Sequence, residues 1–271
     1  MPVDRVTPGT LIAMKKAGET IVALTAYDWP TAEVEQAAGV DMILVGDSMG
    51  TVLFGHETTL KMTMDLMVAH CAAVAQAAGR ALLVGDMPFL STTVSVEEAV
   101  RNAGRFVAEG DMHAVKVEGG EAMAPAIEAI VRAGVPVLGH VGYTPQQTLK
   151  FGRSVVRGRG EEAAGAILRD AEAVERAGAF GIVLECIPLG LAKRVTDRVA
   201  VPTIGIGSGP HCDGQILVVH DMLGLFDKKQ MKFVKRYADL KAQMRAAVEQ
   251  YAAEVRSGAY PDETHAFHDK T

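Results

Sequence analysis

Three acidic residues each stand at the end of a short, mostly apolar run. Asp47 follows Ile-Leu-Val-Gly, Asp86 follows Leu-Leu-Val-Gly, and Glu118 follows Val-Lys-Val. Carboxylates that gather in a low dielectric repel one another, and a divalent cation removes that conflict. Oxygen-only ligands favour a hard ion such as Mg²⁺ over zinc. We therefore predict that these three residues form a Mg²⁺ site; the alternative, that each caps a following helix, is the stronger one for any single aspartate.

Other ionisable residues occupy equivalent positions further along the chain. Lys116 precedes Glu118 by two residues, which places both side chains on the same face of a strand. We expect Lys116 to pair either with a substrate carboxylate or with Glu118 alone. His140 is expected to be a hydrogen-bond donor to substrate, or else a satisfied core histidine. Glu185 is the candidate general base, because partial burial would raise its pKa toward neutrality; the alternative is a structural carboxylate paired with Lys or Arg.

A weak internal repeat explains why these residues would meet. Five segments share a helical run, an Ala-Gly or Glu-Gly stop, a short apolar run and then a polar residue. A glycine at such a stop is typical of the left-handed residue that ends a helix. The apolar runs are rich in Val, Ile and Leu and alternate little, as in parallel strands buried on both faces. The five segments are 37–47, 77–86, 108–118, 132–140 and 176–185.

Three further strands are predicted at 21–25, 202–206 and 216–220, which gives eight strands alternating with helices. This pattern fits either a closed parallel barrel or a doubly wound open sheet. Because Leu-Thr-Ala-Tyr-Asp-Trp-Pro rather than a glycine fingerprint follows the first strand, we favour a single-domain α/β (β/α)8 barrel over residues 1–271, with an N-terminal helical extension. Catalytic residues of such barrels lie at the C-terminal ends of the strands.

The chain from residue 228 to its end does not follow the pattern of the five repeated segments. Residues 228–256 are predicted to form one or two long amphipathic helices, and the polar tail from about residue 261 is expected to be disordered or loosely held. The link between the last two predicted strands, about ten residues, is too short for a full helical unit.

Composition restricts the class of partner. The 271 residues are 49% hydrophobic, 22% charged and carry a net charge of −6, which does not favour nucleic acid. Cys71, Cys186 and Cys212 are widely spaced and odd in number, so we expect no disulfide framework. No run reaches the roughly 18 apolar residues of a membrane helix. Residues 1–10 lack the apolar segment of a signal peptide, and we therefore expect a cytoplasmic enzyme that binds neither membrane nor nucleic acid.

Long motifs in this order closely resemble the ketopantoate hydroxymethyltransferase family, from about residue 5 to 260. They are VGDSMGTVLFGHETTLKMTMDLM (45–67), VGDMPF (84–89), VKVEGG (115–120), GHVGYTPQ (139–146), LECIP (184–188) and IGIGSGPHCDGQILVVHDMLG (204–224).

The resemblance implies roles for individual residues. Asp47, Asp86 and Glu118 match the family's Mg²⁺ site, and Glu185 matches its proton acceptor. The residues that match its ketoacid-binding positions are Asp47, Ser48, Asp86 and Lys116. Ser208 and Tyr143 depart from the residues common in the family, which would trim the folate pocket without touching the chemistry.

The resemblance also implies a reaction. The cosubstrate would be 5,10-methylenetetrahydrofolate, the acceptor 3-methyl-2-oxobutanoate and the product ketopantoate, a precursor of pantothenate and coenzyme A. Mg²⁺ would act as a Lewis acid on the ketoacid, Glu185 would remove the C3 proton, and the stabilised enolate would attack the one-carbon unit. Members of the family are cytoplasmic homo-oligomers, typically decamers, so a decamer built as a pentamer of dimers is expected.

Two other functions stay open at this stage. One is a related Mg²⁺-dependent barrel of the isocitrate lyase or phosphoenolpyruvate mutase type; the Lys-Lys-Cys-Gly-His sequence of those lyases is missing from this chain, which argues against it. The other is a non-catalytic barrel that serves as a binding or scaffold subunit. Such a subunit would have no need to keep metal carboxylates, a base and Lys116 together.

Overall fold

A computed structural model describes residues 5–77, 79–152, 156–226 and 231–268. The chain forms two compact units, Met1–Val219 and His220–Thr271. The first unit contains a closed barrel of eight parallel strands, in which each strand pairs with the next along the chain and β8 pairs with β1. The predicted (β/α)8 barrel is therefore confirmed. The strands are β1 Ile21–Thr25, β2 Met42–Val45, β3 Leu82–Asp86, β4 Ala114–Glu118, β5 Val137–Gly142, β6 Gly181–Glu185, β7 Thr203–Ile206 and β8 Gly214–Leu217.

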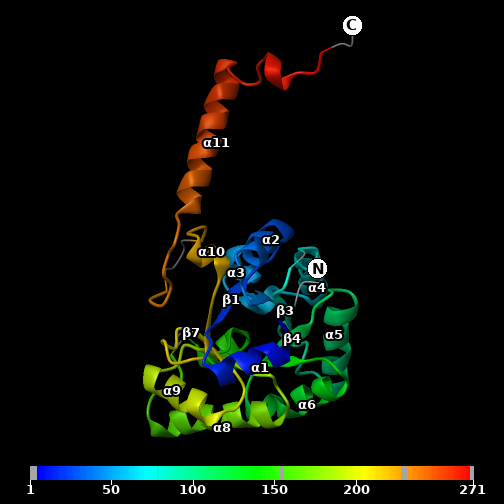
Figure 1. The fold of residues 1–271 in the computed structure, drawn as a ribbon, viewed down its shortest axis with the longest axis vertical. Helices are drawn as coiled ribbons and strands as arrows, with labels where there is room; N and C mark the ends of the chain where they lie inside the picture. Colours follow the sequence, from blue (N-terminus) through cyan, green and yellow to red (C-terminus); the bar gives the residue numbers. More distant parts are fainter. Residues whose placement is uncertain (1–4, 78, 153–155, 227–230, 269–271) are drawn as a thin grey trace. The chain divides into compact units, whose positions relative to one another are not determined.

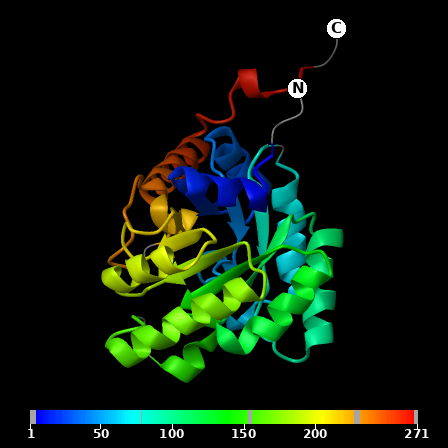
Figure 2. The ribbon, with the colours of Figure 1, turned by 60° about the horizontal axis from the view of Figure 1, so that its bottom comes forward.

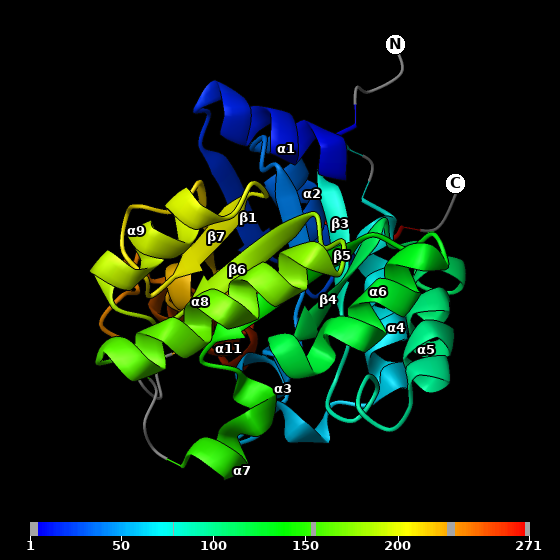
Figure 3. The ribbon, with the colours of Figure 1, turned by 90° about the horizontal axis from the view of Figure 1, so that it is seen from below.

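Helices surround these strands in the first unit (Figure 1), and two other directions of view show the same layering (Figures 2 and 3). Most follow a strand directly, as the βα repeat requires. The α-helices are α1 Pro8–Ala17, α2 Trp29–Ala37, α3 Met49–Val52, α4 Met64–Ala75, α5 Val96–Ala108, α6 Ala124–Arg132, α7 Thr148–Phe151, α8 Glu161–Arg176 and α9 Leu189–Arg198. Short 3₁₀ turns lie at η1 Thr59–Lys61, η2 Glu121–Met123 and η3 Pro145–Gln147.

The predicted N-terminal extension is helix α1, which precedes the first strand. Thr7 caps it in a reciprocal pair of hydrogen bonds with Thr10, and Gly18 ends it in the left-handed conformation. Leu11 of α1 is 1% exposed and belongs to the same buried apolar cluster as Ile21 and Met42 of the first two strands. The ammonium of Lys15 lies 3.0 Å from the carboxylate of Asp213, just before β8. The helix therefore closes the end of the barrel at which the strands begin.

The glycine stops are mostly as predicted. Gly39, Gly134 and Gly178 have positive φ angles directly after α2, α6 and α8. In the segments 77–86 and 108–118 the prediction of a left-handed glycine is wrong, since neither Gly79 nor Gly110 has a positive φ. In the second segment Asp111, with φ 53°, takes that conformation. An aspartate tolerates this region better than most residues with a side chain.

Two boundaries differ from the sequence prediction. The last strand begins at Gly214 and ends at Leu217, whereas 216–220 was predicted, and the next residues form the short helix α10 Val219–Met222. A Cβ at position 214 would stand 2.6 Å from the backbone oxygen of Ile21. The strand therefore begins at a glycine because the neighbouring strand leaves no room for a side chain. No helix separates β7 from β8, as expected from the short link.

The second unit contains helix α11 Leu240–Ser257 and the 3₁₀ turn η4 Glu263–His265. Asp239 caps α11 by accepting a hydrogen bond from the backbone N–H of Ala242. The predicted helix of 228–256 is therefore wrong for residues 231–239, and residues 228–230 lie outside the described residues. Throughout the described part of the chain, every helix is too short or too polar to span a membrane.

Candidate functional site

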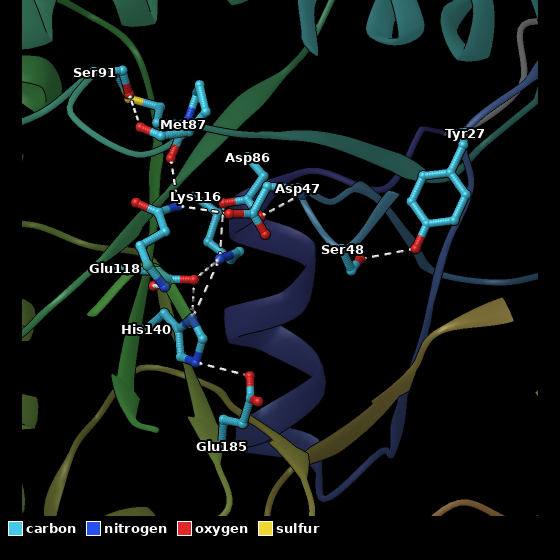
Figure 4. Close-up of polar contacts among 12 residues, drawn as sticks. Tyr27, Asp47, Ser48, Asp86, Met87, Ser91, Lys116, Glu118, His140 and Glu185 are labelled. Atoms are coloured by element: carbon cyan, nitrogen blue, oxygen red, sulfur yellow. Dashed lines mark hydrogen bonds and ion pairs between the residues drawn. The ribbon is translucent and has the colours of Figure 1, made fainter. Parts of the chain in front are cut away.

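Strand register brings the predicted site residues to one end of the barrel. Asp86 of β3 is level with Lys116 of β4, Glu118 is level with His140 of β5, and Gly142 is level with Glu185 of β6. Because successive side chains alternate between the two faces of a strand, residues at these positions can meet above the barrel core. Figure 4 shows the side chains of Asp47, Asp86, Lys116, Glu118, His140 and Glu185 converging on a common region.

Lys116 is the central cation of this cluster. Its Nζ lies 2.8 Å from Asp86 Oδ1 and 3.4 Å from Glu118 Oε1, and the side chain is 5% exposed. Burial alone would lower the pKa of Lys116, but the charges of Asp86, Glu118 and Asp47 outweigh it and raise the pKa above its ordinary value. The residue is therefore a permanently charged ammonium in a buried place.

The two aspartates are not satisfied by this single cation. Burial, together with the charges of Asp86 and Glu118, raises the pKa of Asp47 well above its ordinary value. Burial also raises the pKa of Asp86, although Lys116 opposes the effect. For Glu118 burial is again the largest influence, but Lys116 and His140 reverse it and hold the pKa well below the usual range. Burial therefore disfavours the ionised forms of Asp47 and Asp86, whereas Lys116 and His140 stabilise Glu118 as a carboxylate.

The same pair of aspartates fits a divalent cation. The backbone N–H of Asp47 donates to Asp86 Oδ2 at 3.0 Å, which holds the two residues side by side. Asp86 Oδ1 is buried and, although it is close to Lys116, accepts no well-directed hydrogen bond. Among the described residues, no group of three or more His, Cys, Asp or Glu side chains has the arrangement that would hold a metal ion. At this site the ammonium of Lys116 lies between Asp86 and Glu118.

His140 connects the acidic cluster to Glu185. Its Nδ1 lies 3.3 Å from Lys116 Nζ and 3.5 Å from Glu118 Oε1, while its Nε2 lies 3.2 Å from Glu185 Oε2. The contact with Glu185 is close but poorly directed, since Nε2 makes no hydrogen bond of good angle. Burial favours the neutral ring, yet the contacts with Glu118 and Glu185 prevail and raise the pKa of His140. Among the residues that the structure describes, the ion pair given for Glu185 is with His140.

The backbone around Glu185 is held in an unusual conformation. Cys186 has φ 50°, which is rare for a residue with a side chain, and it immediately follows Glu185 at the end of β6. On the neighbouring strand Gly142 has φ 99°, and a Cβ there would collide with the backbone oxygen of Glu185. Ser208 supports the same strand end by donating from its hydroxyl to Leu184 O at 2.7 Å. Glu185 keeps 18% of its side chain exposed, so it faces open space at the top of the barrel.

Ser48 lies next to Asp47 but contacts a different group of residues. Its Oγ is 2.8 Å from the hydroxyl of Tyr27 (Figure 4). The Thr25 hydroxyl donates to the Tyr27 hydroxyl at 2.9 Å. Although Ser48 precedes α3, its side chain makes no capping hydrogen bond and is free to face Tyr27. The fully buried Tyr27 therefore fixes the orientation of the Ser48 hydroxyl.

Sequence analysis missed Tyr27 and Gln146. The side-chain amide of Gln146 donates to Asp47 Oδ2 at 3.0 Å and to Met87 O at 2.9 Å, and its backbone N–H donates to Glu118 Oε2 at 3.1 Å. Both residues stand in the segments after β1 and β5, within LTAYDWP and GHVGYTPQ. Their place after a barrel strand was a usable signal, but nothing in the sequence indicates which loop side chain turns inward.

The chain matches known proteins over nearly its whole length. The profile described as ketopantoate hydroxymethyltransferase matches residues 5–263. The chain is 51% identical over 263 residues to the 3-methyl-2-oxobutanoate hydroxymethyltransferase of Syntrophus aciditrophicus, with 97% of each chain covered. It is 52% identical over 264 residues to the enzyme of the same name from Moorella thermoacetica, with 97% of this chain and 98% of that one covered.

Among solved structures, a phosphonopyruvate hydrolase in complex with oxalate and Mg²⁺ superposes with a TM-score of 0.63 at 15% sequence identity, covering 96% of this chain and 91% of that chain. At that identity the likeness concerns the fold alone. The profile and the two relatives extend over nearly the whole chain. The chain therefore belongs to the ketopantoate hydroxymethyltransferase family and is an enzyme, a transferase of that family.

Proposed function

We propose that this enzyme transfers a hydroxymethyl group from 5,10-methylenetetrahydrofolate to 3-methyl-2-oxobutanoate and produces ketopantoate for pantothenate and coenzyme A synthesis. The observation that carries the proposal is the meeting of a buried acidic pair, a buried ammonium and a carboxylate that is 18% exposed at one end of the barrel. A scaffold subunit would gain nothing from burying several acidic groups next to one another, which is costly. Membership of the family also argues against the lyase and mutase alternative.

Asp47 and Asp86 are the residues that would hold Mg²⁺, with Glu118 contributing directly or through water. Their oxygen donors suit a hard cation, and the raised pKa values of the two aspartates reflect a demand for positive charge that Lys116 leaves unmet. The similarly folded phosphonopyruvate hydrolase was solved with Mg²⁺ and with oxalate, which is a small dicarboxylate. When bound, Mg²⁺ supplies Lewis acidity that polarises the 2-oxo group and makes the C3 proton more acidic.

Lys116, Ser48 and His140 are the residues that we assign to the oxoacid. The Lys116 ammonium is fixed by Asp86 and Glu118, so it offers a positioned charge for the substrate carboxylate. The Ser48 hydroxyl is oriented by Tyr27 and can donate to a substrate oxygen. His140, with a raised pKa, can donate from its ring to a developing negative charge. Donors fixed before the substrate arrives stabilise such charge without reorganising.

Glu185 is the proposed base that removes the C3 proton. It stands on the far side of His140 from Lys116, and its carboxylate is reachable from the open end of the barrel. The C3 electron pair then forms a carbon–carbon bond to the bridging methylene of the folate, and over the reaction both carbon–nitrogen bonds of that methylene break. The proton taken from C3 and one proton of a water molecule end on the two folate nitrogens. One water molecule is consumed overall, and its oxygen becomes the new hydroxyl. Holding the acceptor and the donor in the reacting orientation can lower the activation free energy by roughly 7–11 kcal/mol.

We further propose that the enzyme works in the cytoplasm as a homo-oligomer, a decamer arranged as a pentamer of dimers. The support is family membership together with the lack of any membrane-spanning helix among the described residues. Sedimentation analysis of the purified full chain measures the oligomer directly, and a monomer at micromolar concentration would refute this part.

The reaction is tested by exchange of the C3 proton of 3-methyl-2-oxobutanoate in deuterated water, followed by NMR without folate. We expect exchange that depends on Mg²⁺, and a loss of roughly 100- to 10,000-fold in Glu185→Gln, the range typical of a missing general base. Glu97→Gln, an exposed glutamate at the start of α5, is the matched control and should exchange normally. Normal exchange by a folded Glu185→Gln protein would exclude Glu185 as the base. If the wild type exchanges no oxoacid at all, the proposed enolate chemistry fails.

A further inference from the structure

We propose that Gln146 is a positioning residue of the metal site, whose amide fixes one oxygen of Asp47 and leaves the other for the cation. The inference rests on the proposed function, because it concerns how the proposed Mg²⁺ ligands are held. Gln146 touches neither substrate nor cosubstrate in this proposal, and it acts through Asp47 and Glu118.

The contacts of Gln146 reach the ends of three different strands. Its Nε2 donates to Asp47 Oδ2 at 3.0 Å, just after β2, and to Met87 O at 2.9 Å, just after β3. Its backbone N–H donates to Glu118 Oε2 at 3.1 Å, at the end of β4. Gln146 itself follows β5 and is 9% exposed. One residue thus ties together the ends of four neighbouring strands around the acidic cluster.

The orientation of the amide follows from its partners. Both groups that face Nε2 are oxygens that only accept, a carboxylate and a backbone carbonyl. The flipped amide would bring Oε1 against two oxygens and leave both without a donor, which is unfavourable in a buried place. The two protons of the NH₂ group are therefore both used, and the side chain has a single suitable orientation.

The local backbone is built to present this residue. Gly142, with φ 99°, turns the chain out of β5, and Thr144, which is 4% exposed, leads into the 3₁₀ turn that starts at Pro145. Proline at the first position of a turn restricts φ and reduces the conformational freedom lost on folding. The backbone N–H of Gln147 closes the turn onto Thr144 O at 2.9 Å. Gln146 is therefore held on an ordered turn and not on a loose loop.

A neutral amide suits this task better than a charged side chain. Lys116 already pairs with Asp86 and Glu118, and a second cation beside Asp47 would supply the charge that a metal ion should supply. An amide donates a hydrogen bond to Asp47 without placing a second positive charge beside it, and it restricts the rotation of the Asp47 side chain. Partners of this kind, one step removed from a metal ion, typically change metal affinity by 10- to 100-fold when they are removed.

Binding of Mn²⁺, which accepts the same oxygen ligands as Mg²⁺, tests the inference without turnover. Free Mn²⁺ is measured by electron paramagnetic resonance while wild-type protein, Gln146→Leu and the control Gln147→Leu are titrated. Leucine is close to glutamine in size but cannot donate a hydrogen bond, so Gln146→Leu removes the contact with little change in shape. Gln147 is the control because it lies in the same turn and has no described side-chain hydrogen bond to the carboxylates. We expect the dissociation constant of Gln146→Leu to rise 10- to 100-fold and that of Gln147→Leu to stay within about threefold of the wild type.

A second measurement separates positioning from general damage. In the C3 exchange assay, Gln146→Leu should need 10- to 100-fold more Mg²⁺ for half-maximal rate but recover most of the wild-type rate at saturating Mg²⁺. If Gln146→Leu does not fold, Gln146→Asn keeps a polar amide that is one methylene too short to reach both partners, and it should lower Mn²⁺ affinity in the same direction.

The possible failures are distinguishable. A wild-type protein that binds no Mn²⁺ overturns the proposed metal site and this inference with it. A wild type that binds Mn²⁺, together with a folded Gln146→Leu protein that binds it equally tightly, overturns the role of Gln146 alone. A lower rate at saturating Mg²⁺ with an unchanged Mg²⁺ requirement would also refute it, because positioning of the metal ligand would then be intact.

Discussion

Glu35 on helix α2 gives a prediction about stability that is independent of the active site. Its side chain is buried, with the residue 4% exposed, and neither carboxylate oxygen has a hydrogen-bond partner in the described part of the chain. Burial, with a smaller contribution from the charge of Asp28, raises the pKa of Glu35 from 4.5 to about 8. At neutral pH the folded protein therefore keeps this carboxyl group protonated, and the unfolded chain does not.

The size and sign of the effect follow from proton linkage. Because the folded state binds the proton more tightly, the free energy of unfolding falls as the pH rises from the unfolded pKa of 4.5 toward the folded pKa of about 8. Each pH unit within that window is worth about 1.4 kcal/mol, so the total loss is at most about 5 kcal/mol. Below the window Glu35 is protonated in both the folded and the unfolded state, and no stability is lost. Above the window Glu35 is ionised in both states, and the loss is complete and no longer changes with pH.

Glu35→Gln removes the titrating group and keeps its shape. Relative to the variant, the wild type should lose about 1.4 kcal/mol of unfolding free energy for each pH unit between about 5 and 8. Above about pH 8 the difference between the two proteins should stay constant. Urea unfolding at each pH, at one fixed protein concentration, measures this difference, with the fluorescence of Trp29 on the same helix as the signal. Glu33→Gln on α2, an exposed residue, is the control and should show no such slope.

The outcome that refutes this reasoning is a difference that does not change with pH, since Glu35 would then ionise alike in both states. A wild type that gains stability over the variant as the pH rises would be a stronger contradiction, because it would require a cationic partner for Glu35 in the folded protein.

Two substitutions test other parts of the barrel. Gly142→Ala forces a side chain into a left-handed backbone and against the oxygen of Glu185, so we expect a loss of about 1–3 kcal/mol in unfolding free energy and at least a tenfold loss of C3 exchange. Gly104→Ala, in a helix with open space around it, should instead stabilise by about 1 kcal/mol; a harmless Gly142→Ala would contradict the assigned strain. Lys15→Met removes the ion pair and two backbone hydrogen bonds that anchor α1 and should cost about 1–3 kcal/mol by thermal unfolding, unlike the exposed Lys16→Met. Equal effects of the two lysine substitutions would show that the anchor is unimportant.

The architecture could be predicted largely because its strands are simple. Segments such as 37–47 and 176–185 contain an apolar run between a glycine and a carboxylate, and β2 and β6 lie within them. The last strand was predicted two residues too late because it begins at Gly214-Gln215, which lacks an apolar pattern. For β8 the packing of Gly214 against its neighbours, and not hydrophobic periodicity, decides where the strand starts.

The helical prediction near the C-terminus was wrong over 231–239 for a related reason. Apolar residues such as Met231, Val234 and Tyr237 recur at helical spacing, but Asp239 begins the helix by capping it at Leu240. Spacing alone does not distinguish a helix from an irregular segment that packs its apolar residues singly. The capping aspartate was the more informative signal.

The site was predictable where it depends on strand ends and obscure where it depends on loops. Asp86, Lys116 and Glu118 follow from strand register, so their proximity could be expected from spacing alone. Gln146 lies 99 residues away from Asp47 in sequence, and its contact depends on the shape of a turn. The pairing of Glu185 with His140 likewise depends on a strained backbone that no pattern in the sequence reveals.

The buried ammonium between Asp86 and Glu118 also bears on how the protein reaches its mature state. Proteins whose only counter-ion for clustered ligands is a metal, such as zinc fingers, stay unfolded until the metal arrives. Here Lys116 is a counter-ion within the chain itself, so we expect the barrel to assemble first and to acquire the proposed Mg²⁺ afterwards. Removing the metal with a chelator should accordingly yield an inactive but fully folded protein that can bind metal again. The metal bound by the mature protein would then depend on which cations are present after folding and not on those present during synthesis.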